Sequence, residues 1–357
     1  MEYLSLPKVI QTGKWRSGHI QGIAIDRERK YLYCSFTTEL VKFDMTGKLI
    51  GTVHGFTGHL GCLACNPTDG RIYASLEYKN DVIGQGILRS LGIDGQVQNA
   101  FYVAVFDGEG ITCLNMDAEK DGVMKTIWLR EPTEDYLAVW EENGQRREHR
   151  HGCSGIDGIT FAPVPGDTKE MRLFVAYGVY GDKTREDNDY QVLLSYQTQN
   201  LAAFESVLTA ENIHKSGPRH CDARYFVHTG NTEFGVQNLE YDTYTGDIFM
   251  AVYRGRKEKY PNYSMFVIDG KKVPESQPLI GCKGEIGQVL SLRQSGLFDE
   301  KSGIYGYEFR YGSTGMLSLG GGFFYFSEDY GENGEFGSMI RLYRYTGSTP
   351  TPFEAVE

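Results

Sequence analysis

A short segment recurs along this chain, and it joins a polar turn containing glycine directly to an apolar strand. The clearest copies are Ser17–Asp26 and Thr57–Asn66, and both place Gly-His immediately before the apolar run. Looser copies begin at Ser154, Phe234 and Ser313. Self-similarity of this kind is typical of repeat architectures. The sequence therefore predicts five related structural units.

Each copy is followed by further short runs of strand-like composition. In the first unit these runs are Lys30–Phe36, Glu39–Asp44 and Gly47–Val53, with Gly and Asp turns between them. A recurring unit of four short strands predicts a β-propeller. The 24 Tyr, 19 Phe and 44 Gly residues favour strands and tight turns over helices. The 357 residues suffice for one domain with a large core.

We therefore predict an all-β, five-bladed propeller in which residues 1–357 form a single domain. The expected blades span residues 15–53, 57–142, 152–210, 234–282 and 313–346. The outer strands of the third blade are expected at Gln191–Gln197 and Glu205–Leu208. Residues 1–14, through the run Leu6–Gln11, are expected to supply the missing outer strand of the last blade. This closure would leave the ring without exposed sheet edges.

The five copies resemble the five-bladed propellers as a class. Carbohydrate-active enzymes of the arabinanase and levansucrase kind share this shape, and they place a carboxylate at the start of an inner strand in several blades. Here the matching positions carry His19, His59 and Asp157, so two of the three depart from that pattern. The resemblance implies a carbohydrate-active enzyme without fixing its mechanism.

In a propeller, the start of the first strand and the end of the second strand of each blade reach the same face, around the central channel. We expect the functional side chains there, because small-molecule sites form in such funnels. The candidate catalytic residues are Asp157, Glu77 and Glu328, and the candidate substrate-binding residues are His19, Gln21, His59, Gln237 and Arg254. Paired carboxylates can divide acid and base roles, and imidazoles transfer protons near neutral pH.

Each of these residues also has a purely structural explanation. His19 and His59 follow a glycine and can cap a neighbouring backbone group, and Asp157 can be a turn residue. Glu77 and Glu328 stand where a strand ends, where exposed carboxylates are common. Arg254 lies in a strongly charged, loop-like stretch. All of these residues are nevertheless expected on one rim, and this shared position indicates a site.

The cofactor stays open, with a divalent metal ion as one candidate. No metal-ligand spacing occurs in the sequence. A His-rich site would require His151 and His220 to join His19 and His59 across long sequence separations.

The leading functional hypothesis is a carbohydrate-active enzyme, a glycoside hydrolase or a lyase, that acts on a small-molecule or oligosaccharide ligand. The alternatives are a non-catalytic binding propeller and a metal-dependent, lactonase-like hydrolase. An enzyme should show carboxylates converging in a closed pocket, whereas a scaffold should show a flat rim with exposed apolar patches.

Several partner classes are disfavoured by composition. The net charge of −11 and the absence of a Lys/Arg block argue against a nucleic-acid partner. No apolar run reaches the roughly 18 residues of a membrane helix, so no membrane partner is expected. The N-terminal residues show no secretory signal, and most of the seven cysteines stand in apolar runs, as reduced thiols do. Cys62 and Cys65 are interpreted as packing residues. We therefore expect a cytoplasmic protein.

Overall fold

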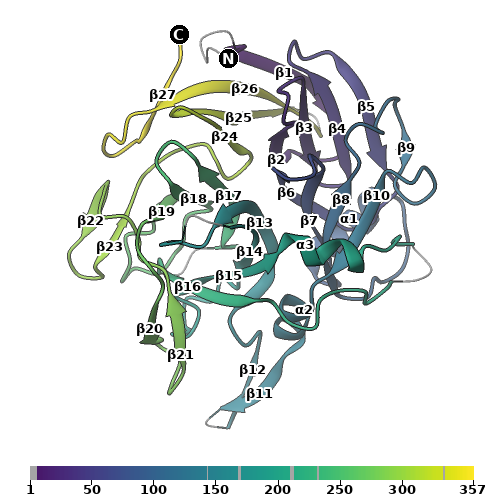
Figure 1. The fold of residues 1–357 in the computed structure, drawn as a ribbon. Coiled ribbons are helices and arrows are strands. Elements are labelled where there is room, and N and C mark those ends of the chain that lie inside the picture. The colour runs from purple at the N-terminus through teal and green to yellow at the C-terminus, as the bar shows by residue number, and fades with distance from the viewer. Residues whose placement is uncertain (1–5, 143, 168–169, 210–212, 231–232, 333) are drawn as a thin grey trace.

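Five small β-sheets surround a common axis in the computed structural model, which describes residues 6–357 except 143, 168–169, 210–212, 231–232 and 333 (Figure 1). Each sheet starts with an inner strand next to the axis and continues outward through antiparallel neighbours. This arrangement confirms the five-bladed, all-β propeller predicted from the sequence.

The strands of the first two blades follow the predicted order, and the third blade differs from the prediction at its outer edge. The first blade contains β2 (Ile20–Ile25), β3 (Tyr31–Phe36), β4 (Glu39–Asp44) and β5 (Leu49–His54), with β9 (Met116–Asp117) added parallel to β5. The second contains β6 (His59–Cys65), β7 (Ile72–Tyr78), β8 (Ala100–Phe106) and β10 (Met124–Trp128). The third contains β13 (Cys153–Pro163), β14 (Met171–Val179), β15 (Tyr190–Gln197) and β16 (Ala223–His228), and it is extended by β21 (Ile286–Val289) and β20 (Glu275–Pro278).

The last two blades complete the ring. The fourth contains β17 (Val236–Asp242), β18 (Asp247–Val252) and β19 (Met265–Ile268). The fifth contains β24 (Met316–Gly320), β25 (Phe323–Glu332), β26 (Glu335–Tyr345) and β1 (Val9–Trp15), with β27 (Phe353–Ala355) also paired to β26. The remaining elements are α1 (Val82–Ser90), α2 (Arg130–Leu137), the hairpin β11 (Val139–Glu142) and β12 (Gln145–Glu148), α3 (Thr198–Leu201), the short 3-10 turn η2 (Ala202–Phe204), β22 (Leu297–Asp299) and β23 (Ile304–Gly306).

The N-terminal strand closes the ring, as predicted. β1 pairs antiparallel with β26, with Ile10 opposite Ile340 (Figure 1). Residues 1–5 of the expected closing segment lie outside the described residues. Five clusters of buried side chains hold the ring together, and each one joins two neighbouring blades. Every blade is therefore packed on both sides, which explains why the second strands are nearly continuous apolar runs.

The predicted outer edge of the third blade is wrong. Its fourth strand is β16, which pairs with β15, and not Glu205–Leu208. Ser206 instead exchanges backbone hydrogen bonds with Thr126 at the outer edge of the second blade. The reason is that residues 198–204 turn as α3 and η2 and carry the chain to the neighbouring sheet before it returns. The predicted end of this blade, residue 210, lies outside the described residues.

Four inner strands share a local distortion where they start. The pairing register shifts between Ile20 and Gly22 in β2, and equivalent shifts occur in β6, β13 and β17. These irregularities are β-bulges, which bend a strand and re-aim a side chain. They fall at Gln21, Gly61, Asp157 and Gln237, so the structure aligns Asp157 with Gln21 and Gly61, and not with His19 and His59 as the sequence copies had suggested.

Candidate functional site

A cavity of about 890 Å³ opens where the inner strands begin and the second strands end. Four blades contribute polar residues to its lining, including His19, Gln21, Thr37, His59, Glu77, Lys79, Asp157, Gln237 and Tyr253, and the lining also contains Asp81, Ser154, Asp182 and Glu233. Val82 and Ile83 of α1, together with the segment after β14 and Phe234, add apolar and aromatic surface. A concave, largely apolar lining with a few convergent polar groups is the usual form of a small-molecule site.

The floor of the cavity holds a buried ion pair. Glu77 and Lys79 are both almost completely buried, and the Lys79 ammonium lies 2.5 Å from Oε1 of Glu77. The other carboxylate oxygen, Oε2, accepts a hydrogen bond of 2.7 Å from the backbone N–H of Ile156 on the third blade. Gly155 permits this contact, because a Cβ at that position would lie 2.2 Å from Oε2. Both oxygens of Glu77 are therefore already engaged.

Burial alone would lower the pKa of Lys79, but the neighbouring carboxylates of Glu77, Asp157 and Asp81 raise it, so the ammonium stays charged. Lys79 also donates to the carbonyl of Ser154 at 3.1 Å. These contacts tie the second blade to the third beneath the cavity.

His59 and Asp157 face each other in the cavity. Nδ1 of His59 lies 3.5 Å from Oδ1 of Asp157. Among the described residues, neither atom makes a hydrogen bond that satisfies it. Burial lowers the pKa of His59, but the charges of Asp157 and Glu77 outweigh burial and raise it above its usual value. Asp157 is held on its other oxygen by the Gln237 amide, which donates at 3.3 Å.

Two neighbouring groups complete the environment of Asp157. Ser75 of the second blade donates a hydrogen bond of 2.8 Å to its backbone carbonyl. Gly61 leaves room beside the carboxylate, because a Cβ there would lie 3.2 Å from Oδ1 of Asp157 and 2.4 Å from Oγ of Ser75. The carboxylate is thus positioned by strands of three blades.

His19 is in the opposite electrostatic situation. Burial, followed by the charge of His59, lowers its pKa. The amide nitrogen of Gln21 lies 3.2 Å from Nε2 of His19, and the hydroxyl of Tyr253 lies 3.5 Å from the same atom. The rim therefore combines one imidazole that favours the charged form with one that favours the neutral form, the separation expected of an acid and a base.

The structure brings six of the eight candidate residues into this cavity: His19, Gln21, His59, Glu77, Asp157 and Gln237. Glu328 and Arg254 do not line it. Glu328 accepts hydrogen bonds of 2.7 Å from both Arg341 and Tyr343 on the adjacent strand β26. The expectation that Glu328 faces the channel is wrong, because its carboxylate turns along the sheet toward these two donors.

Arg254 is likewise outside the cavity. Its guanidinium is largely exposed, donates to the backbone carbonyl of Asn262 and pairs with Glu308 at 2.9 Å. The segment after β18 carries Arg254 away from the axis, and Tyr253, one residue earlier, is the side chain that reaches the cavity.

The His-rich site considered as an alternative is not assembled, because His151 and His220 lie beside other carboxylates and do not line the cavity. His151 lies 3.4 Å from Glu285, and surrounding burial and arginine charges lower its pKa to about 3. His220 is 68% exposed and lies 3.9 Å from Glu131. The one group of metal-binding side chains found among the described residues is His59, Glu77 and Asp157, whose ligand atoms lie within 4.8 Å of one another. Because Glu77 is already paired with the Lys79 ammonium, it is less available as a ligand, which limits how well the three residues can bind a cation.

Lys79, α1 and the residues after β14 also line the cavity, although none of them had been predicted from the sequence as part of the site. Lys79 follows Glu77 by two positions and so projects from the same side, which was a readable signal. The helix α1 begins inside a stretch rich in Gly, Asp and Gln. Asp81 caps it by accepting a hydrogen bond from the backbone of Gly84.

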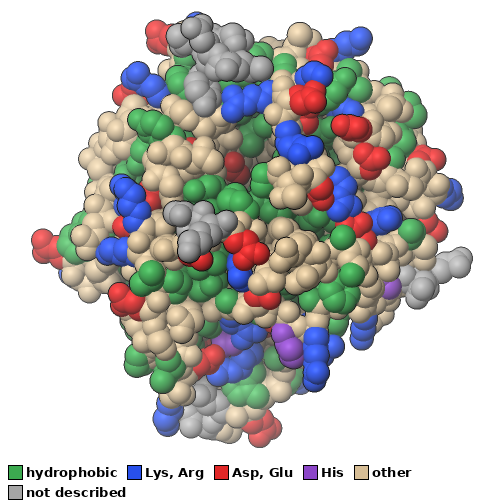
Figure 2. Space-filling view, viewed as in Figure 1, with side chains coloured by type: hydrophobic (Ala, Val, Ile, Leu, Met, Phe, Trp, Pro, Cys, Tyr) green, Lys and Arg blue, Asp and Glu red, His purple; other side chains and the backbone are tan. Residues whose placement is uncertain are grey.

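Acidic and basic side chains are interspersed over the face shown in Figure 2. Among the described residues, no helix has the length and apolar character needed to cross a membrane. All seven cysteines are free thiols; four of them are buried, and Cys113 is exposed. Cys62 and Cys65 make separate contacts, with Ile159 and with Gly70, as packing residues do.

No protein-family model matches the sequence, and no curated protein matches it either. Solved structures resemble the fold loosely. One is the soluble aldose sugar dehydrogenase of Escherichia coli in the apo-form, with a TM-score of 0.38, 10% identity, and coverage of 93% of this chain and 98% of that chain. Another is the calcium structure of a Trichoderma reesei carbohydrate-active enzyme of family AA12, with a TM-score of 0.40, 12% identity, and coverage of 90% and 80%. A third is the Dos1 propeller, with a TM-score of 0.32, 10% identity, and coverage of 90% and 77%.

Proposed function

We propose that this propeller is an enzyme that transfers protons on a carbohydrate-like, polyhydroxylated ligand bound at the mouth of the channel. The observation that carries the proposal is the pair His59 Nδ1 and Oδ1 of Asp157, which lie 3.5 Å apart in the cavity with no other hydrogen-bond partner among the described residues. Buried polar atoms that lack a further partner in the protein can form hydrogen bonds with a ligand that enters the cavity.

Elimination, the lyase reaction, is the better-supported class. Hydrolysis by two carboxylates needs a second free carboxylate about 5 to 9.5 Å from the first. Glu77 is engaged on both oxygens, and Glu328 lies outside the cavity. The three other carboxylates that line the cavity are engaged as well: Asp81 accepts a hydrogen bond from Gly84, Asp182 accepts one from Thr184, and Glu233 pairs with Arg256 at 2.8 Å. In an elimination, a base removes a proton from carbon, the carbon–carbon double bond forms, and the carbon–oxygen bond breaks as an acid protonates the leaving oxygen.

The residues divide these roles as follows. Protonated His59 gives its proton to the leaving oxygen. Asp157 holds the imidazolium in its charged form and accepts a hydrogen bond from a ligand hydroxyl. Neutral His19 takes the proton from carbon, and Gln237 orients Asp157. The opposite pKa shifts of the two imidazoles support this division.

The test is a substrate screen with two readouts. Oligosaccharides of uronic acids are assayed for the ultraviolet absorbance of an unsaturated product, and aryl glycosides and lactones are assayed for release of their leaving group, with and without a chelator. An unsaturated product that disappears in Asp157→Asn supports the lyase. Leaving-group release without unsaturation shows hydrolysis and overturns it. A ligand that binds and is recovered unchanged favours the non-catalytic binding propeller.

A metal-dependent, lactonase-like hydrolase is the second candidate, because His59, Glu77 and Asp157 offer three ligand atoms close together. In that case these residues would hold the cation, and the cation would polarise a carbonyl. The test is calorimetric titration of chelator-treated protein with Ca²⁺, Mn²⁺ and Zn²⁺. Binding that is lost in Asp157→Asn and kept in Glu328→Gln supports it.

We also propose a reducing, cytoplasmic location. Seven free cysteines, four of them buried, support that proposal. Fractionation of cells that produce the protein tests it.

A further inference from the structure

The cavity does not end at the channel. A second groove of about 780 Å³ runs between α1 and the rim of the first blade, and Thr37 and Ile83 line both spaces. The site cavity alone is already large enough for a small ligand, since such pockets typically hold about 300 to 1,000 Å³. The groove therefore continues a site that a single sugar ring would fill only in part.

The two walls of the groove differ in chemistry. The wall formed by α1 and the turn after it presents Ile83, Ile87, Leu91 and Ile93. The facing wall presents polar groups, including Ser17, Thr37, Glu39 and Asn115. A sugar ring has an apolar face of C–H groups and a polar edge of hydroxyls, so it matches such a pair of walls.

The apolar wall of the groove is exposed to solvent. The side chains of Val82, Ile83, Leu91 and Ile93 are 84%, 41%, 40% and 41% exposed. Exposed apolar side chains that gather along one groove mark a binding surface. Three of these four residues line the groove, and Val82 lines the site cavity.

The position of α1 is rigidly determined. Gly84 packs so closely that a Cβ there would lie 1.6 Å from the carbonyl oxygen of Lys79. The backbone N–H of Asn80 donates to the side chain of Asn99 at 2.7 Å, which ties the two ends of the inserted segment together. Because α1 starts three residues after Lys79, the groove wall is fixed directly to the floor of the site.

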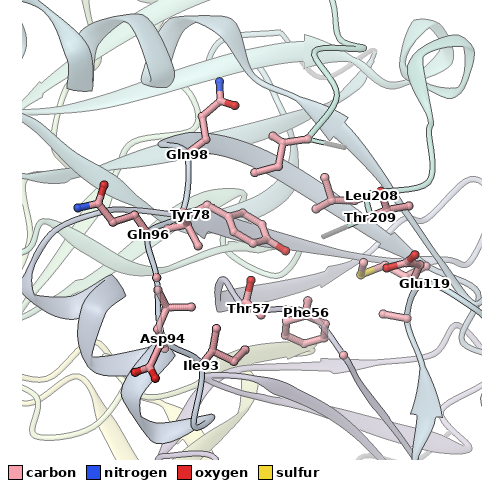
Figure 3. A pocket seen from close by; sticks show the side chains of 17 residues that line it. Phe56, Thr57, Tyr78, Ile93, Asp94, Gln96, Gln98, Glu119, Leu208 and Thr209 are labelled. Atoms are coloured by element: carbon pink, nitrogen blue, oxygen red, sulfur yellow. The ribbon is translucent and has the colours of Figure 1, made fainter. Parts of the chain in front are cut away.

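The groove leads on toward a third space. Phe56, Thr57 and Ile93 line both the groove and a neighbouring cavity of about 400 Å³, where Figure 3 shows them along one edge below Tyr78. The site cavity, the groove and this third cavity therefore form a series that leads away from the channel. The successive units of a chain-like ligand would occupy such a series.

We propose that the ligand is an oligosaccharide of at least two units, with the reacting unit over His59 and Asp157 and the next unit in the groove beside α1. This inference rests on the proposed function and adds the length of the substrate. Binding affinity should therefore rise with the chain length of the oligosaccharide. A bulky side chain placed in the groove should abolish this rise and leave the affinity for the monomer unchanged.

The experiment measures calorimetric binding to the Asp157→Asn protein, in which turnover should be at least about a hundredfold slower. The probes are glucose with cellobiose and cellotriose, and galacturonic acid with its dimer and trimer. Ser90→Trp fills the groove, because Ser90 lines it and lies outside the site cavity. Arg89→Trp, on the preceding position of the same helix, is the matched control, because Arg89 lines neither space.

The dimer or trimer of at least one series should bind at least about tenfold more tightly than its monomer. In Ser90→Trp this gain should vanish while monomer binding is kept, and in Arg89→Trp the gain should remain. Equal binding of all lengths, no binding of any probe, or a gain that survives Ser90→Trp overturns the inference.

Turnover by the unsubstituted protein on the same probes separates this inference from the proposed function. Length-dependent binding without product rejects the activity and leaves the extended site standing. Product formed equally well from short and long probes rejects the extended site alone.

Discussion

Nδ1 of His59, on the second blade, lies 3.5 Å from Oδ1 of Asp157, on the third. The two residues are 98 positions apart in sequence, and the contact exists because both blades place a bulge at the start of their inner strands. The seam between the blades is closed beneath them by Glu77, which accepts a hydrogen bond from the backbone of Ile156. The candidate site is therefore formed by the interface between the second and third blades and not by either blade alone.

The first prediction concerns the charge on Asp157. Asp157→Asn keeps the shape of the side chain, and it should lower turnover by at least about a hundredfold, the low end for acid–base catalysis. Glu328→Gln is the matched control, since Glu328 binds Arg341 and Tyr343 away from the cavity, and its turnover should stay near that of the unsubstituted protein. Steady-state kinetics with thermal unfolding checks both. Full activity in Asp157→Asn would reject the assignment, and lost stability would make Asp157 a structural turn residue.

The second prediction concerns the pKa of His59. Asp157 and Glu77 raise this pKa, so Asp157→Asn should lower it, as read from the imidazole signals in NMR titrations. If His59 is the acid, activity should fall as pH rises through its folded-state pKa, and that limb should move to lower pH in a residually active variant. A His59 pKa that is unchanged in Asp157→Asn would contradict the electrostatic coupling.

The same shift affects stability with a definite sign. A histidine whose folded-state pKa is raised contributes stability below the unfolded-state pKa, here about 6.5, and loses it as pH rises through the folded-state value. The difference in unfolding free energy between the unsubstituted protein and His59→Gln should therefore favour the former more at acidic than at alkaline pH.

The third prediction concerns the buried pair Glu77–Lys79. Lys79→Met leaves the Glu77 carboxylate buried without its ammonium partner, and breaking a buried pair costs about 3 to 5 kcal/mol of unfolding free energy. The double variant Glu77→Gln/Lys79→Met should recover most of that loss, because no unpaired charge remains. Denaturant unfolding of both single variants and the double variant checks this. Additive losses would show that the pair does not act as a unit.

The fourth prediction concerns Glu240 of β17. Burial raises its pKa well above the usual value, although the backbone N–H of Ser318 donates to it at 2.8 Å. A carboxyl with a raised folded-state pKa makes the protein lose stability as pH rises from the unfolded-state pKa toward the folded-state one. Glu240→Gln should remove this loss, so it should gain stability relative to the unsubstituted protein as pH rises from about 4.5.

The comparison for Glu240 is the same substitution at the exposed Glu300, which controls for the loss of one acidic side chain. Parallel stability curves for Glu240→Gln and the unsubstituted protein across that pH range would sink the prediction.

The repeated turn-and-strand segments determined much of this structure. They predicted five blades, the inner strands and the closing role of the N-terminal strand, because strand pattern and turn chemistry are local properties of the chain. They matched Asp157 with His19 and His59, whereas the bulges in the structure place Asp157 at the position of Gln21 and Gln237, and these three side chains line one cavity.

Only the tertiary structure decided which rim residues meet. Glu77 and Glu328 both end second strands, yet Glu77 turns inward to Lys79 and the backbone of Ile156, whereas Glu328 turns along its sheet to Arg341 and Tyr343. The direction of each carboxylate depends on donors that other strands supply, and in the case of Glu77 one of them comes from another blade. Strand periodicity says that a side chain reaches the rim, but the hydrogen-bond partners assembled by folding determine where it points.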